Sequence, residues 1–405
     1  MVVFYILANA ISPPGQMGGN TKIFLEFSKR WAKSGNTVSV ITSEKGHRTC
    51  QNYNLNTAKY YIVSSSKSER LSPPIHNVIQ TIKSSINLRH FPKNCSSELK
   101  VIYSASNLWS DVIPALVLKK RLTNSKWVGT CYLPIPNPFK GFEFAYESKY
   151  RLFPRFNDLA NYIVEKISTS FLVRYADLLF VTNDLDKAYF ADEGMPLACI
   201  KAIYGGVDLK AILTVPDQEH KYDGCFVGRL HPMKGILYLV EIWSYVCKIR
   251  SDSKLALIGN GAKDFEQIVR GEIKKRGLEK NIDLLGFVDG MEKYKILKSS
   301  KVFLHTSIYD NSGMTAAEGM ACGLPAVRFD IPTLRVAYPK GMLVVPLKDC
   351  KKFAEAVLKL LQDDIVYNQL KKQALDLAKI WDWDRKAPDA LDYILQEIGP
   401  ENAKT

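Results

Sequence analysis

The chain has 405 residues, of which 46% are hydrophobic and 24% charged, a globular composition that argues against disorder. Its length suggests two domains of about 200 residues each. The formal net charge is +14, and the first hundred residues alone carry +9. Such a basic half favours nucleic acid, an anionic membrane surface or a phosphorylated acceptor as partner, although a merely soluble basic surface would show the same charge.

The cysteines and the first apolar run indicate the cellular compartment of the protein. The eight cysteines are scattered, with no CxxC pair and no Cys/His cluster, which is typical of reduced thiols in a cytosolic protein. The run MVVFYILA lacks a basic flank and precedes a Gly/Pro turn, so it predicts a buried strand and not a signal peptide. No stretch reaches the roughly 20 apolar residues of a membrane span. We expect a cytoplasmic protein, free or at the inner face of the membrane.

Short apolar runs alternate with helical patterns along the chain. Such runs, bounded by turn residues and separated by helices, predict parallel strands that are covered on both faces. We therefore expect two doubly wound, Rossmann-like α/β domains facing a central cleft, with ligands at the carboxyl ends of the strands. The predicted strands are VVFYILA (2–8), TVSVIT (37–42), LKVIYSA (99–105), KWVGTCY (126–132), DLLFVTN (177–183) and CIKAIYG (199–205), then DGCFVGR (223–229), KLALIGN (254–260), IDLLGFV (282–288), KVFLHTS (301–307), PAVRF (325–329) and MLVVP (342–346).

The domain boundaries follow from where this pattern stops and restarts. It restarts at Asp223, after a polar stretch that contains proline. The expected parts are a first domain (1–204), a linker (205–222), a second domain (223–380) and a C-terminal helix (381–405). That last helix packs on the second domain or crosses back to the first, and periodicity does not decide between the two.

A glycine pair follows the first predicted strand. Gly18 and Gly19 stand directly before an amphipathic helical pattern, where backbone N–H groups can approach an anion near the positive end of a helix. Tight turns also use glycine routinely, so the pair alone is weak evidence. The turn has neither the GxGxxG spacing nor the GxxxxGKS pattern, and a dehydrogenase or a P-loop ATPase is not supported.

Two further loops follow strands of the second domain. Gly228, Arg229 and Lys234 lie on the first of them, where the two cations can converge on a diphosphate; the alternative is a pair of solvated loop cations. Asn260 and Gly261 end the next strand, and this glycine turn would let a flat ring pack against the backbone.

The stretch DNSGMTAAEGMACG places two acids around the start of a helix. The N–H groups of Ser312, Gly313 and Met314 are expected to be free for phosphate oxygens. Asp310 and Glu318 would flank that phosphate, which suits a nucleotide sugar: one acid accepts from sugar hydroxyls and the other from ribose hydroxyls. The alternative is that Asp310 caps the helix and Glu318 is a buried structural acid.

These motifs, in this order and with YGGVD (204–208) and LLGFV (284–288) between them, resemble a family 4 glycosyltransferase of the GT-B fold. The resemblance implies a retaining, metal-independent enzyme that transfers a sugar from a nucleotide diphosphate sugar to a hydroxyl of a saccharide or lipid-linked acceptor. It implies that the first domain binds the acceptor and the second the donor. By the same resemblance, Arg229 and Lys234 bind the donor diphosphate and Glu318 binds the ribose. Gly18 and Gly19 match the loop that closes on the donor.

Two positions depart from the family pattern. Asp310 stands at the first position of the E-x7-E motif in place of the usual glutamate and is one methylene shorter. Tyr132 stands where many members have an active-site histidine, and a tyrosine can donate a hydrogen bond but is uncharged near neutral pH. We predict a catalytic set of Asp310, Arg229, Lys234 and Tyr132.

No metal or other cofactor is expected. The run NDLD (183–186) could suggest a metal site, but its place before a helical pattern favours helix capping by an acidic first turn. The basic first half and the aromatic, basic residues 139–175 favour peripheral contact with an anionic membrane, although residues 139–175 fit core-packing helices with surface charges equally well. No nucleic-acid motif is present. Two alternatives stay open: a sugar-nucleotide epimerase of the same fold, and a non-catalytic basic protein that binds nucleic acid or membrane.

Overall fold

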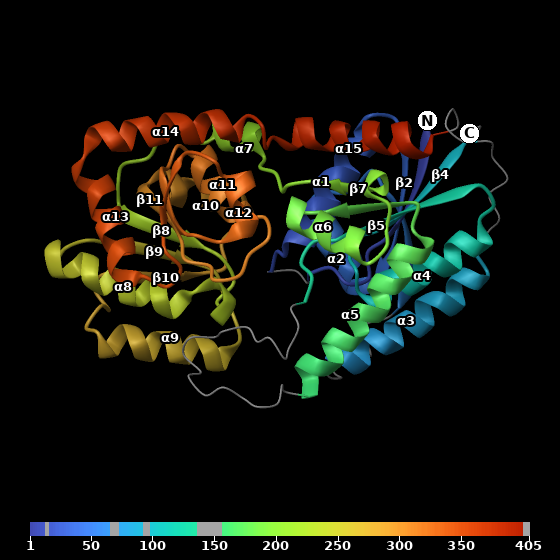
Figure 1. Cartoon of the computed structure of the whole chain (residues 1–405), viewed down its shortest axis with the longest axis horizontal. Helices are drawn as coiled ribbons and strands as arrows, with labels where there is room; N and C mark the ends of the chain where they lie inside the picture. The colour runs from blue at the N-terminus through green and yellow to red at the C-terminus, as the bar shows by residue number, and fades with distance from the viewer. Residues whose placement is uncertain (13–15, 65–72, 92–97, 136–155, 400–405) are drawn as a thin grey trace. The chain divides into compact units, whose positions relative to one another are not determined.

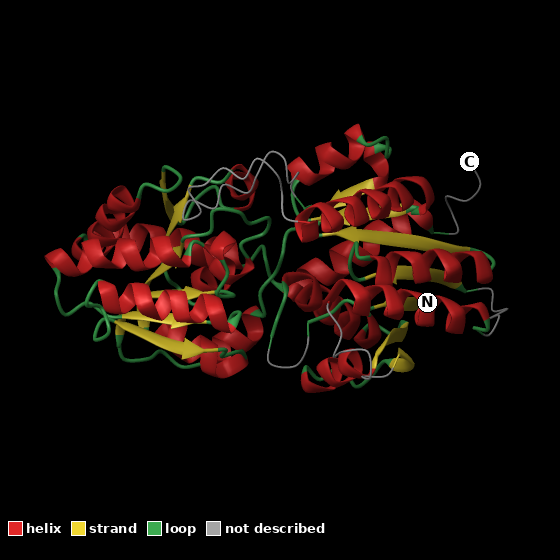
Figure 2. Cartoon of the chain, turned by 90° about the horizontal axis from the view of Figure 1, so that it is seen from below, coloured by secondary structure: helices red, strands yellow, loops and turns green. Residues whose placement is uncertain are grey.

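The computed structural model describes residues 1–12, 16–64, 73–91, 98–135 and 156–399. Within it the chain divides into two compact units, residues 1–204 with 384–405 and residues 205–383. Each unit is a parallel sheet with helices on both faces, and Figure 2 shows the strands of each unit lying between helices. The residues 136–155, which include part of the predicted aromatic and basic stretch, lie outside the described residues.

The first unit is built on a seven-stranded parallel sheet with the order β3-β2-β1-β4-β5-β6-β7 (Figure 1). Its strands are β1 (Val2–Leu7), β2 (Thr37–Ser43), β3 (Lys59–Ser64), β4 (Leu99–Ser104), β5 (Ser125–Cys131), β6 (Leu178–Val181) and β7 (Ile200–Ala202). Its helices are α1 (Gly19–Lys33), α2 (Glu44–Asn52), α3 (Pro73–Arg89), α4 (Trp109–Arg121), α5 (Phe156–Tyr175), α6 (Asp184–Asp192) and α15 (Trp383–Ile398), which begins at the boundary between the units.

The second unit is built on a six-stranded parallel sheet with the order β10-β9-β8-β11-β12-β13. Its strands are β8 (Tyr222–Val227), β9 (Leu255–Ile258), β10 (Ile282–Gly286), β11 (Ser300–His305), β12 (Ala326–Phe329) and β13 (Met342–Val345). Its helices are α7 (Leu209–Thr214), α8 (Ile236–Ile249), α9 (Lys263–Lys275), α10 (Gly290–Lys298), α11 (Met314–Ala321), α12 (Pro332–Ala337), α13 (Cys350–Gln362) and α14 (Asp364–Ala378).

All the predicted strands are confirmed, and within the described residues one further strand was missed. Most of the confirmed strands are runs of buried residues, as a sheet covered on both faces requires, whereas β7, β10 and β13 at the sheet edges are only partly buried. The missed strand, β3, is at the edge of the first sheet, and most of its residues are not buried. An edge strand has less apolar surface to bury, so its sequence carries a weaker signal.

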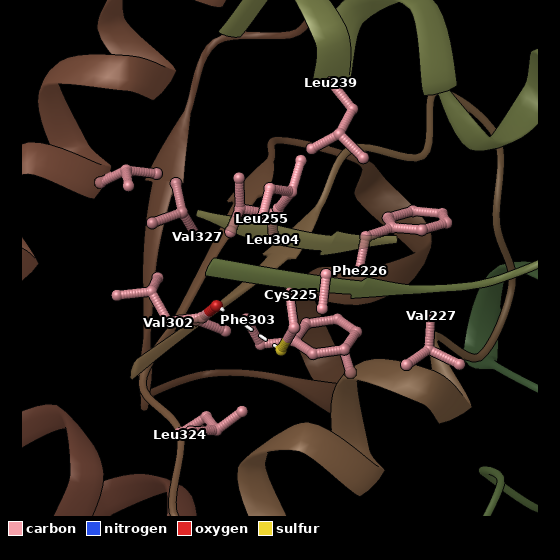
Figure 3. Close-up of a cluster of buried hydrophobic side chains, with 14 of the residues drawn as sticks. Cys225, Phe226, Val227, Leu239, Leu255, Val302, Phe303, Leu304, Leu324 and Val327 are labelled. Carbon is pink, nitrogen blue, oxygen red and sulfur yellow. Dashed lines mark hydrogen bonds between the residues drawn. The ribbon is translucent and has the colours of Figure 1, made fainter. Parts of the chain in front are cut away.

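The core of the second unit forms around its two central strands. β8 and β11 are neighbours, with Val302 paired to Gly224 and Phe303 to Cys225. Figure 3 shows their side chains packed together, with the Cys225 Sγ 3.7 Å from the Val302 carbonyl oxygen. Each such apolar side chain contributes roughly 1.5–3 kcal/mol when fully buried. This packing gives the loops that leave β8 and β11 a rigid base.

The stretch expected to be a linker is part of the second unit. Residues 205–222 contain α7, whose start is capped by Asp208, because the Asp208 Oδ1 accepts from the Ala211 N–H at 3.0 Å. Ile212 and Val215 are buried in the core of the second unit. These apolar anchors fix the segment, although its charged and proline-containing end gives it the composition of a linker.

The C-terminal helix α15 belongs to the first unit from Asp384 onward. The Trp31 Nε1 on α1 donates to the Ala387 carbonyl at 2.9 Å, and the Arg30 Nε lies 2.7 Å from the Asp384 Oδ1. α15 is therefore held against α1 by a buried hydrogen bond and a partly exposed ion pair. Among the described helices, none is long and apolar enough to cross a membrane.

Candidate active site

The predicted donor residues of the second unit lie where its strand order reverses. From β8 the chain runs outward through β9 to β10, then returns to the other side of β8 as β11. Ligands of open α/β sheets bind at this kind of switch point, outside the carboxyl ends of the strands. The loop after β8 and the loop after β11 interlock there: the Ile308 N–H donates to the Met233 carbonyl at 2.9 Å, and the Thr306 hydroxyl to the Lys234 carbonyl at 3.0 Å.

Two glycines allow the loops at this edge to approach so closely. Gly235 has a φ of +65°, and a Cβ built there would lie 1.9 Å from the Thr306 carbonyl oxygen. At Gly259, φ is +146° and a Cβ would lie 1.8 Å from the Gly228 carbonyl oxygen. No side chain fits in either gap, so the sequence motif places glycine where backbone meets backbone.

The loop after β8 presents two cations and one neutral histidine. Arg229 is exposed, whereas Lys234 is partly buried and paired with Asp310. Burial, together with the charges of Arg229 and Lys234, lowers the pKa of His231 to about 4. The neutral His231 ring accepts from the Met233 N–H at its Nδ1, at 3.3 Å, and so shapes the turn. The positive charge of this loop therefore comes from Arg229 and Lys234.

Asp310 lies inside the loop after β11 and is 9% exposed. Its Oδ2 lies 2.5 Å from the Lys234 Nζ and 3.2 Å from both the His305 Nε2 and the Ser307 Oγ. Its Oδ1 accepts from the Gly313 N–H at 3.1 Å. Burial would raise the pKa of Asp310, but the Lys234 ammonium and the His305 contact outweigh it and hold that pKa well below its usual range. Asp310 is an anion surrounded by donors.

Glu318 is also buried and paired. Its Oε1 lies 2.8 Å from the Nζ of Lys293, which in turn lies 2.8 Å from the Asp289 Oδ1. Burial alone would lower the pKa of Lys293, but the two carboxylates raise it, so the ammonium stays charged. The sequence analysis missed Lys293. It is 25 positions from Glu318 on a separate helix, and a lysine in a polar helical stretch gives no signal of such a contact.

The remaining predicted residues of the second unit lie at the same edge. Gly313 caps α11 and Met314 is its first residue; Ser312 comes just before. The Gly313 N–H was expected to be free, but it donates to Asp310, because the acid folds back over the helix start. After β9, the Asn260 carbonyl accepts from the Leu230 N–H at 2.8 Å, and the Gly261 N–H donates to Glu266 at 2.8 Å.

Of two cavities in the second unit, only the smaller one lies near the predicted donor residues. One, of about 40 Å³, lies beside Gly259, Leu230 and Gly286, at the strand ends. The other, of about 470 Å³, is lined mainly by α7 and α14 and contains none of the predicted residues. The carboxyl edge of the sheet, and not the larger cavity, carries the converging charges that a donor would need, so we place the candidate site there.

Gly18, Gly19 and Tyr132 belong to the first unit. The Gly18 N–H donates to the Ser12 hydroxyl at 2.9 Å, and Gly19 is the exposed first residue of α1. Tyr132 is buried, and its hydroxyl lies 2.5 Å from that of Tyr103. Burial and the neighbouring Tyr103 raise the pKa of Tyr132, so its phenol stays neutral.

The acidic run after β6 acts as a helix cap. The Asn183 Oδ1 accepts from the Asp186 N–H at 2.9 Å at the start of α6, which confirms the capping interpretation. Within the described part of the chain, no group of three or more His, Cys, Asp or Glu residues is arranged to hold a metal ion.

Comparisons with known proteins agree with this fold. Residues 215–376 match the family described as glycosyl transferases group 1. Anabaena HepE, crystallised with UDP and glucose, aligns with a TM-score of 0.70 over 97% of this chain and 98% of its own, at 14% identity. TarM of S. aureus, in complex with fondaparinux, alpha-GlcNAc-glycerol and UDP, aligns with a TM-score of 0.73 over 98% and 99%, at 12% identity. The chain therefore has the GT-B fold, and residues 215–376 of its second unit are similar to group 1 glycosyl transferases.

A curated relative is similar over part of its length. Poly(glycerol-phosphate) alpha-glucosyltransferase of Bacillus subtilis is 27% identical over 222 residues, which cover 51% of this chain and 32% of that enzyme. Across the curated relatives, the chain spans between 32% and 60% of the relative's own length.

Proposed function

We propose that the protein is a retaining, metal-independent glycosyltransferase that uses a nucleotide diphosphate sugar as donor. The observation that carries this proposal is the meeting of Arg229, the Lys234–Asp310 pair and the start of α11 at the switch point of the second unit. Two cations and a helix N-terminus converging on one edge suit a diphosphate. Glu318, farther along α11, is the proposed acceptor of ribose hydroxyl hydrogen bonds. HepE and TarM, which share the fold, were crystallised with UDP.

The proposed chemistry is electrostatic. Arg229, Lys234 and the N-terminal amides of α11 stabilise the negative charge that develops on the departing diphosphate. The departing phosphate oxygen takes the proton of the acceptor hydroxyl as the new glycosidic bond forms. Retention of the anomeric configuration rests on the resemblance to family 4 enzymes, since the site holds no arrangement of nucleophile, base and orienting group.

The first test is donor binding. Thermal unfolding would be followed with UDP-, GDP-, ADP- and dTDP-sugars, for the wild type and for Glu318→Gln. A ligand at 100 times its Kd adds about 2.7 kcal/mol of stability, which is measurable. We expect a shift with one nucleotide class that Glu318→Gln reduces. Glu292→Gln is the matched control, because Glu292 is exposed and pairs with Lys295 on the protein surface. No shift with any nucleotide sugar contradicts the proposal.

The second test is turnover. With the donor identified, proton NMR of the product reports the anomeric configuration, and inversion of it contradicts a retaining enzyme. Full activity in EDTA is expected, and loss of activity that Mg²⁺ or Mn²⁺ restores contradicts metal independence. Conversion of the donor sugar without an acceptor favours the epimerase alternative.

For the acceptor, we propose a hydroxyl of a saccharide or of a lipid-linked saccharide, bound by the basic first unit at the cytoplasmic face of a membrane. The charge of +9 over the first hundred residues supports this, since each cation near an anionic surface contributes roughly 1 kcal/mol. We expect sedimentation with vesicles that contain phosphatidylglycerol, release at high salt, and no binding to phosphatidylcholine alone. Binding that is indifferent to anionic lipid contradicts the membrane proposal, and a salt-dependent shift of RNA or DNA without donor binding favours the binding-protein alternative.

A further inference from the structure

Asp310 stands where the resemblance places an acid that contacts the donor sugar, but its Oδ2 already has three donors and its Oδ1 has one. A carboxylate offers about four acceptor positions. In this structure four donors approach Asp310: Lys234, His305 and Ser307 at Oδ2, and the Gly313 N–H at Oδ1. His305 and Ser307 are themselves 2% and 1% exposed, so this environment is the interior of the loop and not its surface.

We propose that Asp310 is a positioning residue, which acts on the donor diphosphate through Lys234 and does not contact the sugar. This inference rests on the proposed function, because it assumes that the diphosphate binds beside Lys234. It reassigns the role of the first acid of the motif in this chain.

The contacts show how one carboxylate can set both positive elements of the site. An ammonium group has three N–H donors. One of those of Lys234 is directed to the Asp310 Oδ2, which leaves the others for phosphate oxygens, and the lysine backbone is fixed by the Thr306 hydroxyl. At its other oxygen, Asp310 holds Gly313, the cap of α11. The lysine and the helix start therefore share one anchor.

The length of the side chain fits this role. Aspartate is one methylene shorter than the glutamate of the family pattern, and here its carboxylate is drawn back toward His305 at the end of β11. The Asp310 carbonyl accepts in addition from the Thr333 hydroxyl, so the backbone of this residue is also tied in place. An acid held at both its backbone and its carboxylate has little freedom to turn toward a ligand.

The test compares the binding of a nucleoside diphosphate with the binding of the corresponding nucleotide sugar. Titration calorimetry would measure the Kd of UDP and of UDP-glucose, or of the pair that the thermal screen selects, for the wild type and Asp310→Asn. Asparagine keeps one acceptor oxygen for Gly313, and its melting temperature without ligand verifies that it folds. We expect both affinities to fall by the same factor, about tenfold, because the substitution removes the charged hydrogen bond that positions Lys234. In a Lys234→Met background, Asp310→Asn should cause no further loss.

Asp330→Asn is the matched control, since Asp330 also follows a strand of this sheet and pairs with Arg335; we expect it to change neither Kd. The inference is overturned if Asp310→Asn weakens UDP-glucose but not UDP, because that pattern indicates a sugar contact. Unchanged or tighter UDP binding, or an additive loss in the Lys234→Met background, also overturns it. A wild type that binds no nucleoside diphosphate is a failure of the proposed function itself, and the inference falls with it.

Discussion

The switch points of the two sheets are held together by different means. In the second unit, backbone packs against backbone at Gly235 and Gly259, and ion pairs tie the loops together. In the first unit, the sheet order reverses between β1 and β4, and the loops there are joined by one buried acid. The Asp111 Oδ1 accepts from the Asn9 N–H at 2.7 Å and its Oδ2 from the Ser106 hydroxyl at 2.6 Å.

The two edges should therefore respond differently to pH. Glycine packing does not depend on pH, whereas burial raises the pKa of Asp111 to about 7, despite the hydrogen bonds from Ser106 and Asn9 that lower it. The edge with the predicted diphosphate site is thus fixed by shape and paired charge, while the edge of the first unit responds to protonation near neutral pH. Substitutions at each edge test that contrast.

The largest expected effect is that of Gly235→Ala. The new Cβ would lie 1.9 Å from the Thr306 carbonyl oxygen, and φ is +65°, so the two loops must separate. We expect a loss of about 4 kcal/mol or more in the free energy of unfolding, measured by urea denaturation. Gly277→Ala is the control, because its φ is +67° but nothing lies within 4 Å of the added Cβ; it should cost only about 1 kcal/mol. Equal losses would contradict the role of close packing.

Lys293→Met should have the next largest effect. It leaves the buried Glu318 and the partly buried Asp289 without their shared cation. Removing one partner of a buried ion pair costs about 3–5 kcal/mol, because an uncompensated charge remains. Lys295→Met, in the same helix but paired with the exposed Glu292, should change stability by less than about 1 kcal/mol. Chemical denaturation of the two variants decides the matter, and a Lys293→Met protein as stable as the wild type would show that the network is not buried as described.

Asp111→Asn should change the pH dependence of stability. Because burial raises the pKa of Asp111 from 3.8 to about 7, its contribution to stability is fully present below pH 4 and is lost as pH rises through 7. The wild type should therefore lose up to about 4 kcal/mol over this window relative to Asp111→Asn, which cannot ionise. Denaturation at pH 4 to 8 measures the difference. A constant difference across that range would mean that Asp111 does not titrate there.

The smallest expected effect is that of Trp31→Phe. Phenylalanine keeps most of the ring packing but leaves the Ala387 carbonyl without the 2.9 Å hydrogen bond from the indole. We expect a loss of about 1 kcal/mol. Hydrogen exchange in α15 should rise while that of the second unit, which contains neither residue, stays as in the wild type. A uniform increase in both units would contradict a local role.

The sequence predicted what local pattern determines. Buried apolar runs predicted the strands, and turn residues predicted the loops between them. It did not predict contacts between distant side chains: Lys234 and Asp310 are 76 positions apart, and Asn9 and Asp111 are 102 apart. Asp111 in particular stands in the first turn of a helix, where an acid normally interacts with the helix dipole. Only the folded chain shows that it is buried against another loop.

Because α15 packs on α1, the first unit can complete its fold only after the second unit has been synthesised. The second unit is one continuous segment, residues 205–383, whereas the first needs residues from 384 onward to cover α1. Domains generally fold in the order in which the ribosome releases them. Here the part that emerges first has Trp31 and Arg30 without their final partners until the whole of the second unit has been made. During that interval the nascent first unit lacks the helix that later packs on Trp31 and Arg30.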